Sequence, residues 1–95
     1  MSDPSILVLS SLAGGDKHGY AMIEDIERFA GVRLGPGTLY GAITRLEERG
    51  WIAPVAAEDR RQPYTITGAG REHLREELGD LGRIVRAGLR RLEDS

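Results

Sequence analysis

The residues that decide the fold are 34–50, which run LGPGTLYGAITRLEERG. The glycine- and proline-rich start predicts a turn, and proline suits the first position of the helix that the turn feeds. Leu39, Ile43 and Leu46 then recur at i, i+4 and i+7, which is the spacing of one apolar helix face. The final glycine is typical of a helix end. We therefore expect a helix over residues 36–49.

The outward face of this helix has a composition that suits the major groove of DNA. Gly41 lets the backbone approach closely, Thr44 can meet a thymine methyl group or a phosphate, and Arg45 can reach guanine or a phosphate. Thr38 and Tyr40 lie near the helix start, where exposed backbone amides favour anions. The competing interpretation is an ordinary solvated face with a half-buried Tyr40.

Two shorter helices are expected before this one. The first opens at Asp3-Pro4, is apolar on nearly all sides over residues 6–12, and ends at a glycine pair. The second runs from about His18 to Ala30, and we expect His18 to play a structural part at its start. The inner stripe of this second helix is expected to consist of Tyr20, Ile23, Ile26 and Phe29.

After residue 50 the pattern changes to two short strands, Trp51–Val55 and Gln62–Ile66. Each strand contains a proline, which confines it to a sheet edge, so the prediction is a two-stranded hairpin. The polar turn Glu58–Arg61 connects the strands. Arg60 and Arg61 would then lie at the tip of a wing, where a backbone phosphate or a minor groove could be reached. The alternative is a solvated turn whose two acids weaken the positive field.

A long helix is expected from the capping Thr67 to about Leu92. Acids occupy its first half and arginines its second, which complements the helix dipole. Its apolar residues follow a heptad-like spacing, which favours pairing with a second copy of the helix, although folding back on the first helix is the competing arrangement. The predicted dimer interface consists of Leu74, Leu78, Leu81, Val85, Leu89 and Leu92.

The order of these elements predicts a mostly α fold with a small β-hairpin: a winged helix-turn-helix followed by a long C-terminal dimerisation helix. We expect residues 1–70 to form the DNA-binding domain and residues 71–95 to form the dimerisation helix. A chain of 95 residues has room for one core, and a domain this small gains from a partner chain.

Composition narrows the function further. The chain has no cysteine and only two distant histidines, so we expect no metal site and no thiol chemistry. No catalytic triad, phosphate loop or dinucleotide motif is present, so we expect no enzyme activity and no cofactor. Without a signal peptide or a membrane-spanning run, the default location is the cytoplasm. The net charge of −2 on its own argues against a nucleic-acid binder, but the positions of the charges matter more than their sum. The acids of the wing turn and of the second helix predict modest non-specific DNA affinity.

Several short motifs, in order, resemble the PadR family of bacterial transcriptional regulators. They are His18-Gly19-Tyr20, then Gly37-Thr38-Leu39-Tyr40, then Arg60-Arg61, and then Tyr64 to Gly70. The resemblance covers roughly residues 5–80 and is to the short subfamily with a single C-terminal helix. It implies a homodimer that binds palindromic promoter DNA, usually as a repressor. It also implies that the helix over residues 36–49 reads the major groove and that the wing touches the backbone.

The resemblance leaves three questions open. Tyr64 could bind phosphate or pack behind the wing. Some short members hold flat aromatic drugs between tryptophans of the last helix, but residues 71–92 contain no aromatic side chain, so a small-molecule effector here would need an apolar, non-aromatic pocket between the last helices and the first. A winged helix used as a protein-interaction module, without direct DNA reading, is the rival function.

Overall fold

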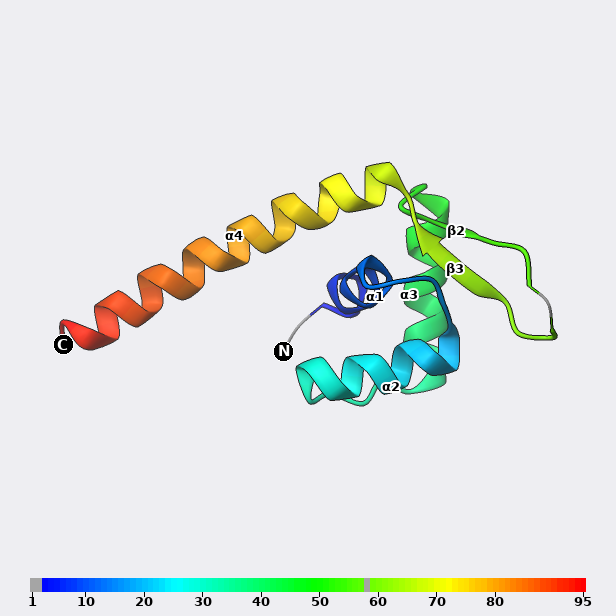
Figure 1. The fold of residues 1–95 in the computed structure, drawn as a ribbon. Helices are drawn as coiled ribbons and strands as arrows, with labels where there is room; N and C mark the ends of the chain where they lie inside the picture. Colours follow the sequence, from blue (N-terminus) through cyan, green and yellow to red (C-terminus); the bar gives the residue numbers. More distant parts are fainter. Residues whose placement is uncertain (1–2, 58) are drawn as a thin grey trace.

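A computed structural model of the chain describes residues 3–57 and 59–95, and these form four helices and a three-stranded sheet (Figure 1). This is the mostly α fold with a small sheet that the sequence predicts. The elements in chain order are α1 (Pro4–Ala13), β1 (Lys17–His18), α2 (Gly19–Ala30), α3 (Pro36–Glu48), β2 (Ile52–Pro54), β3 (Pro63–Ile66) and α4 (Gly68–Glu93).

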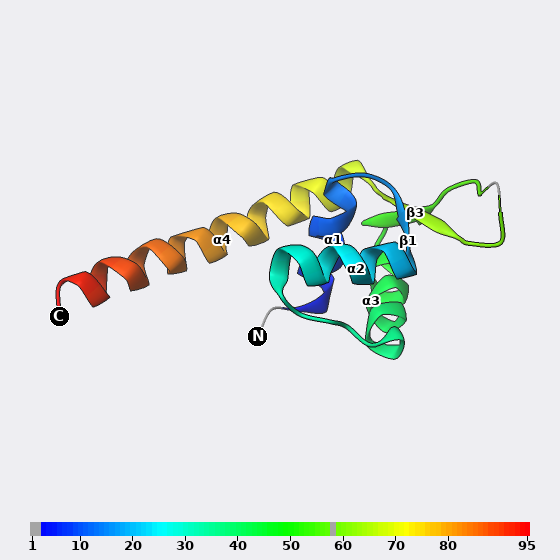
Figure 2. The same ribbon diagram turned by 60° about the horizontal axis from the view of Figure 1, so that its bottom comes forward.

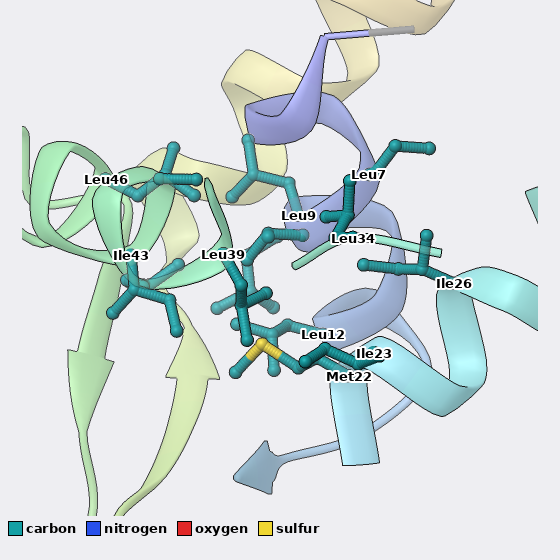
Figure 3. Packing of buried hydrophobic residues seen from close by; sticks show 14 of the residues in the cluster. Leu7, Leu9, Leu12, Met22, Ile23, Ile26, Leu34, Leu39, Ile43 and Leu46 are labelled. Atoms are coloured by element: carbon teal, nitrogen blue, oxygen red, sulfur yellow. The ribbon is translucent and has the colours of Figure 1, made fainter. Parts of the chain in front are cut away.

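Helix α1 lies at the centre of the folded unit, where it contacts α2, α3, α4 and β3. Its apolar residues, predicted to face protein on nearly all sides, are buried accordingly. Burial of this surface against the inner faces of α2 and α3 drives folding. Figure 3 shows side chains from α1, α2, α3 and the segment between α2 and α3 converging. The labelled ones are Leu7, Leu9, Leu12, Met22, Ile23, Ile26, Leu34, Leu39, Ile43 and Leu46.

Local signals in the sequence set the helix ends. The Asp3 carboxylate accepts a hydrogen bond from the backbone N–H of Ser5 at 2.8 Å, and Thr67 caps α4 by accepting from the N–H of Gly70 at 3.0 Å. Gly31 follows α2 with a φ of 70°, a left-handed conformation that glycine adopts without the cost other residues meet. The predicted boundaries of α2, α3 and α4 are confirmed to within one residue.

The sheet differs from the predicted two-stranded hairpin. Its order is β1-β3-β2, so β3 is the central strand, and Lys17 pairs with Tyr64 on its far side. The expectation that proline confines β3 to an edge is therefore wrong. Pro63 is tolerated because it is the first residue of the strand, where its missing N–H breaks no interior ladder, and its carbonyl still accepts from the N–H of Val55 at 3.1 Å.

The inner stripe of α2 also differs from the prediction. Met22, Ile23 and Ile26 are buried, whereas Tyr20 and Phe29 are 58% and 50% exposed. Starting from Gly19, the buried positions follow i, i+3, i+4 and i+7, and this stripe takes Met22 in place of Tyr20. The assignment of Tyr20 to the core was therefore wrong, and its ring lies at the surface near the start of α2.

Helix α4 begins in the core and then leaves it. Gly70 lies so close to the backbone of Trp51 that an added Cβ would collide with the Trp51 carbonyl oxygen. The Trp51 ring also stacks on His73 with ring centroids 3.7 Å apart. Leu74 is 6% exposed and belongs to the core, so α4 runs without a break across the predicted domain boundary at residues 70 and 71. Figures 1 and 2 show the rest of α4 projecting away from the other helices, on the side opposite to the wing.

Candidate nucleic-acid interface

Helix α3 presents the predicted polar face to solvent. Leu39, Ile43 and Leu46 are almost completely buried, which fixes the rotation of the helix. Thr38, Tyr40, Thr44 and Arg45 are exposed on its other side, and Gly41 is partly exposed between them. The hydroxyl of Thr44 donates a hydrogen bond to the carbonyl oxygen of Tyr40 at 2.9 Å, one turn earlier in α3.

The wing is the connection between β2 and β3, and it carries the exposed residues Arg60 and Arg61. The Asp59 carboxylate accepts a hydrogen bond from the backbone N–H of Arg61 at 2.8 Å and so shapes the turn. The side-chain amide of Gln62 donates to the carbonyl oxygens of Val55 and Pro63, each at 2.8 Å, and closes the base of the wing. Residue 58, whose charge was expected to weaken the field of the wing, lies outside the described residues.

The start of α3, the start of α2 and the wing meet around one open hollow of about 390 Å³. Gly19 allows this meeting, because a Cβ there would lie only 2.5 Å from the hydroxyl oxygen of Tyr40. The structure therefore brings Tyr40, Arg60 and Arg61, three of the predicted DNA contacts, together around one hollow. The hollow is lined by His18, Gly19, Tyr20, Tyr40, Arg60, Arg61 and Gln62.

Sequence reasoning missed part of this hollow. His18 was expected to be structural, and its Nδ1 does accept a hydrogen bond from the N–H of Ala21 at 3.3 Å, which caps α2. The other ring nitrogen, Nε2, lies 3.3 Å from the Nη1 atom of Arg61. The two residues are 43 positions apart in the chain, and only the pairing of β1 with β3 brings them together.

Five of the eight predicted DNA contacts do not line this hollow, and Arg45 and Tyr64 are two of them. Arg45 lines a different hollow of about 330 Å³, which it shares with Arg49, Trp51 and His73. Tyr64 is partly buried and packs against the core, in keeping with the packing alternative. Burial raises the pKa of the Tyr64 hydroxyl above its ordinary value of 10, and the charges of Glu47 and Tyr40 add to this rise.

The projecting part of α4 carries a stripe of apolar side chains that the described residues of the chain leave exposed. Five of the six predicted interface residues lie on it, with exposed fractions from 42% at Leu81 to 73% at Leu92. Leu74 is the exception, because it is buried in the core of its own chain. Ile84, at 67% exposed, borders the stripe and was not predicted, although its spacing of three from Leu81 was a signal for it. The exposed predicted residues are Leu78, Leu81, Val85, Leu89 and Leu92.

A smaller hollow of about 180 Å³ lies between α1 and α4, the two elements between which the sequence analysis placed any effector pocket. Its apolar lining from Ala13, Leu74 and Leu78 is joined by Arg71 and Arg75, two cationic groups that the sequence did not place there. The described residues hold no cluster of three or more potential metal ligands. Within the same part of the chain, every helix is too short or too polar to cross a membrane.

Comparison with known proteins finds relatives that match most of this chain. The chain is 45% identical over 83 residues to an uncharacterised 37.1 kDa protein in transposon TN4556 of Streptomyces fradiae, and 34% identical over 82 residues to the transcriptional regulator Rv3488 of Mycobacterium tuberculosis. These matches cover 87% and 83% of the chain. They cover 24% of the Streptomyces protein, so the chain spans about a quarter of its length, and 76% of Rv3488.

A solved structure and a family model agree with these matches. A transcriptional regulator from Clostridium thermocellum superposes with a TM-score of 0.79 at 26% identity, over 88% of this chain and 84% of its own. Residues 8–76 match the family described as "Transcriptional regulator PadR-like family". This family consists of transcriptional regulators rather than enzymes, in agreement with the sequence prediction. The chain therefore belongs to the PadR-like family of transcriptional regulators.

Proposed function

We propose that this chain binds duplex DNA directly, with the outward face of α3 in the major groove and the wing against the backbone. One observation carries the proposal: the start of α3 and the wing open into the same hollow, where Tyr40, Arg60 and Arg61 are exposed together. A helix and a flanking wing placed side by side match the way winged helices hold a groove and an adjacent phosphate row. The proposed DNA contacts are Thr38, Tyr40, Gly41, Thr44, Arg45, Arg60 and Arg61.

Membership in a family of transcriptional regulators supports this proposal, and the sign of the local charge agrees with it. The chain as a whole is acidic, but the described lining of the hollow carries two arginines and no carboxylate. Because local rather than net charge governs contact with phosphates, the overall charge of −2 does not oppose binding. The many acidic side chains elsewhere on the chain predict only modest affinity for non-specific DNA.

We further propose that the active form is a homodimer joined through α4. The stripe of Leu78, Leu81, Val85, Leu89 and Leu92 leaves large apolar side chains in water over four turns, which is costly unless a partner covers them. A second copy supplies a matching stripe, because a twofold interface places the same surface on both chains. Such a dimer would present two α3 helices about 34 Å apart and bind an inverted repeat, most simply as a repressor that occludes a promoter.

Selection of binding sites from a random duplex pool at about physiological salt tests this function. Enrichment of an inverted repeat with half-sites about 10 base pairs apart is expected. Absence of any enriched sequence, at this salt and again at low salt where phosphate contacts are strongest, would reject direct sequence reading. A pull-down would then test the alternative, a protein-interaction module, which the acidic side chains of Glu47 and Glu48 on α3 would suit.

A further inference from the structure

The contact between His18 and Arg61 brings together more hydrogen-bond donors than acceptors. Nδ1 of His18 accepts a hydrogen bond from the backbone N–H of Ala21, so the proton of the neutral ring must sit on Nε2. Nε2 then faces Nη1 of Arg61 at 3.3 Å, and a guanidinium has only donors. In this tautomer, Nε2–H and the guanidinium are two donors that lie close together, and an acceptor placed between them would bind both.

The other protonation states of His18 do not resolve this conflict. If the proton moved to Nδ1, Nε2 could accept from Arg61, but Nδ1 would then oppose the N–H of Ala21 and the cap of α2 would be lost. A doubly protonated ring would oppose both donors. Only an added acceptor, placed between Nε2–H and the guanidinium, lets the ring cap α2 and satisfies both donors together.

The surroundings determine which acceptor fits. The pair opens into the hollow between α2, α3 and the wing, whose described lining also offers the hydroxyls of Tyr20 and Tyr40 and the guanidinium of Arg60. No carboxylate is among these lining residues. The nearest described acid on the wing, Asp59, already accepts from the backbone of Arg61. A site of converging donors beside a fixed cation is suited to a phosphate oxygen.

We propose that His18 and Arg61 jointly bind one phosphate of the DNA backbone, with His18 donating from Nε2 while its Nδ1 keeps α2 capped. This proposal rests on the proposed function and adds to it a DNA contact outside α3 and the wing. It also gives His18 a second task besides capping, since the phosphate selects the tautomer that the cap requires. The contact is independent of sequence and fixes the position of the wing on the duplex.

A double-mutant cycle on a short duplex of random sequence tests the proposal without knowledge of the operator. Arg61→Ala should weaken binding about ten-fold and lower the slope of log affinity against log salt by about 1, because one phosphate contact is lost. His18→Asn keeps a side chain that caps helices well but lacks the Nε2 donor. It should weaken binding about five-fold with little change in slope, because no positive charge is removed.

The two substitutions should not add. Because both remove contacts to the same phosphate, the double variant should bind about as weakly as Arg61→Ala alone. Arg28→Ala is the matched control: it removes one arginine from the far end of α2 and should leave affinity and slope unchanged. His18→Asp also caps α2 but places a carboxylate at the phosphate, so it should bind more weakly than His18→Asn. Thermal unfolding of each variant checks that α2 stays folded.

The outcomes separate this proposal from the function it rests on. If the wild type binds duplex DNA but His18→Asn binds equally well, or the two substitutions simply add, the shared phosphate is rejected while DNA binding stands. If the wild type binds no duplex, both fail together. At matched ionic strength, inorganic phosphate should inhibit DNA binding more than chloride does, because it competes for the same site. This difference should disappear in Arg61→Ala, and equal inhibition of the wild type by the two anions would contradict a phosphate site at His18 and Arg61.

Discussion

The two regions of this chain differ in how far their large apolar side chains are buried. From α1 to the first turns of α4, large apolar side chains such as Leu9, Leu12 and Leu39 are completely buried within one chain. Beyond Leu74, the same kind of residue is left in water, as at Leu89, which is 58% exposed. The comparison teaches that the first region buries its apolar core within one chain, whereas the apolar side chains of the second need a partner chain to cover them.

A substitution at the junction between the two regions should have the largest effect on the stability of the chain. Gly70→Ala places a methyl group against the carbonyl of Trp51, which is backbone and cannot move aside. We expect a loss of about 3 kcal/mol or more in the free energy of unfolding, measured with urea at fixed protein concentration. Gly68→Ala, two residues earlier and with nothing within 4 Å, should change stability by less than about 1 kcal/mol. Equal effects at the two glycines would contradict the close junction.

A substitution in the second region should weaken dimerisation and leave the folding of each chain intact. Val85→Asp would bury two unpaired carboxylates in a twofold interface, so we expect the dimer dissociation constant to rise about 100-fold or more. Sedimentation equilibrium measures this shift. Ala87→Asp adds the same charge about 160° round the helix from Val85 and serves as the control. If both variants remain as dimeric as the wild type, the apolar stripe is not the interface.

A smaller effect should separate folding from DNA binding on α3. Gly41→Ala should stabilise α3 by about 0.5–1 kcal/mol, because alanine is the better helix former. The same methyl group would stand between the helix and the groove, so affinity for DNA should fall about ten-fold. Gly79→Ala in α4 has open space around it and should show the gain in stability without the loss of binding. Unchanged affinity in Gly41→Ala would place that face of α3 away from DNA.

The smallest predicted effect concerns pH. Burial raises the pKa of Tyr64 in the folded state above 10, so the unfolded chain loses this proton first as the pH rises. The free energy of unfolding should therefore decline as the pH increases above about 10 and be unaffected by Tyr64 below it. Tyr64→Phe should make this decline shallower, as measured by urea unfolding between pH 9 and 11. An unchanged decline would contradict the burial of the Tyr64 hydroxyl.

Sequence reasoning succeeded where a signal is local and periodic. The spacing of Leu39, Ile43 and Leu46 predicted α3 and its outward face, and Pro36 and Gly50 predicted its boundaries. It failed where tertiary pairing decides: β1 has two residues, too few for a pattern, and without it β3 was assigned to an edge. The same strand brings His18 to Arg61, so that part of the candidate site had no signal in either segment alone.

Sedimentation equilibrium of the chain with a duplex carrying the selected inverted repeat, and with a duplex carrying one half-site, tests the central claim most directly. The account predicts two chains on each full repeat, a dimer already present without DNA, and clearly weaker binding to the single half-site. One chain per duplex, with equal affinity for both duplexes, would contradict the claim that α4 joins two copies so that two α3 helices read DNA together.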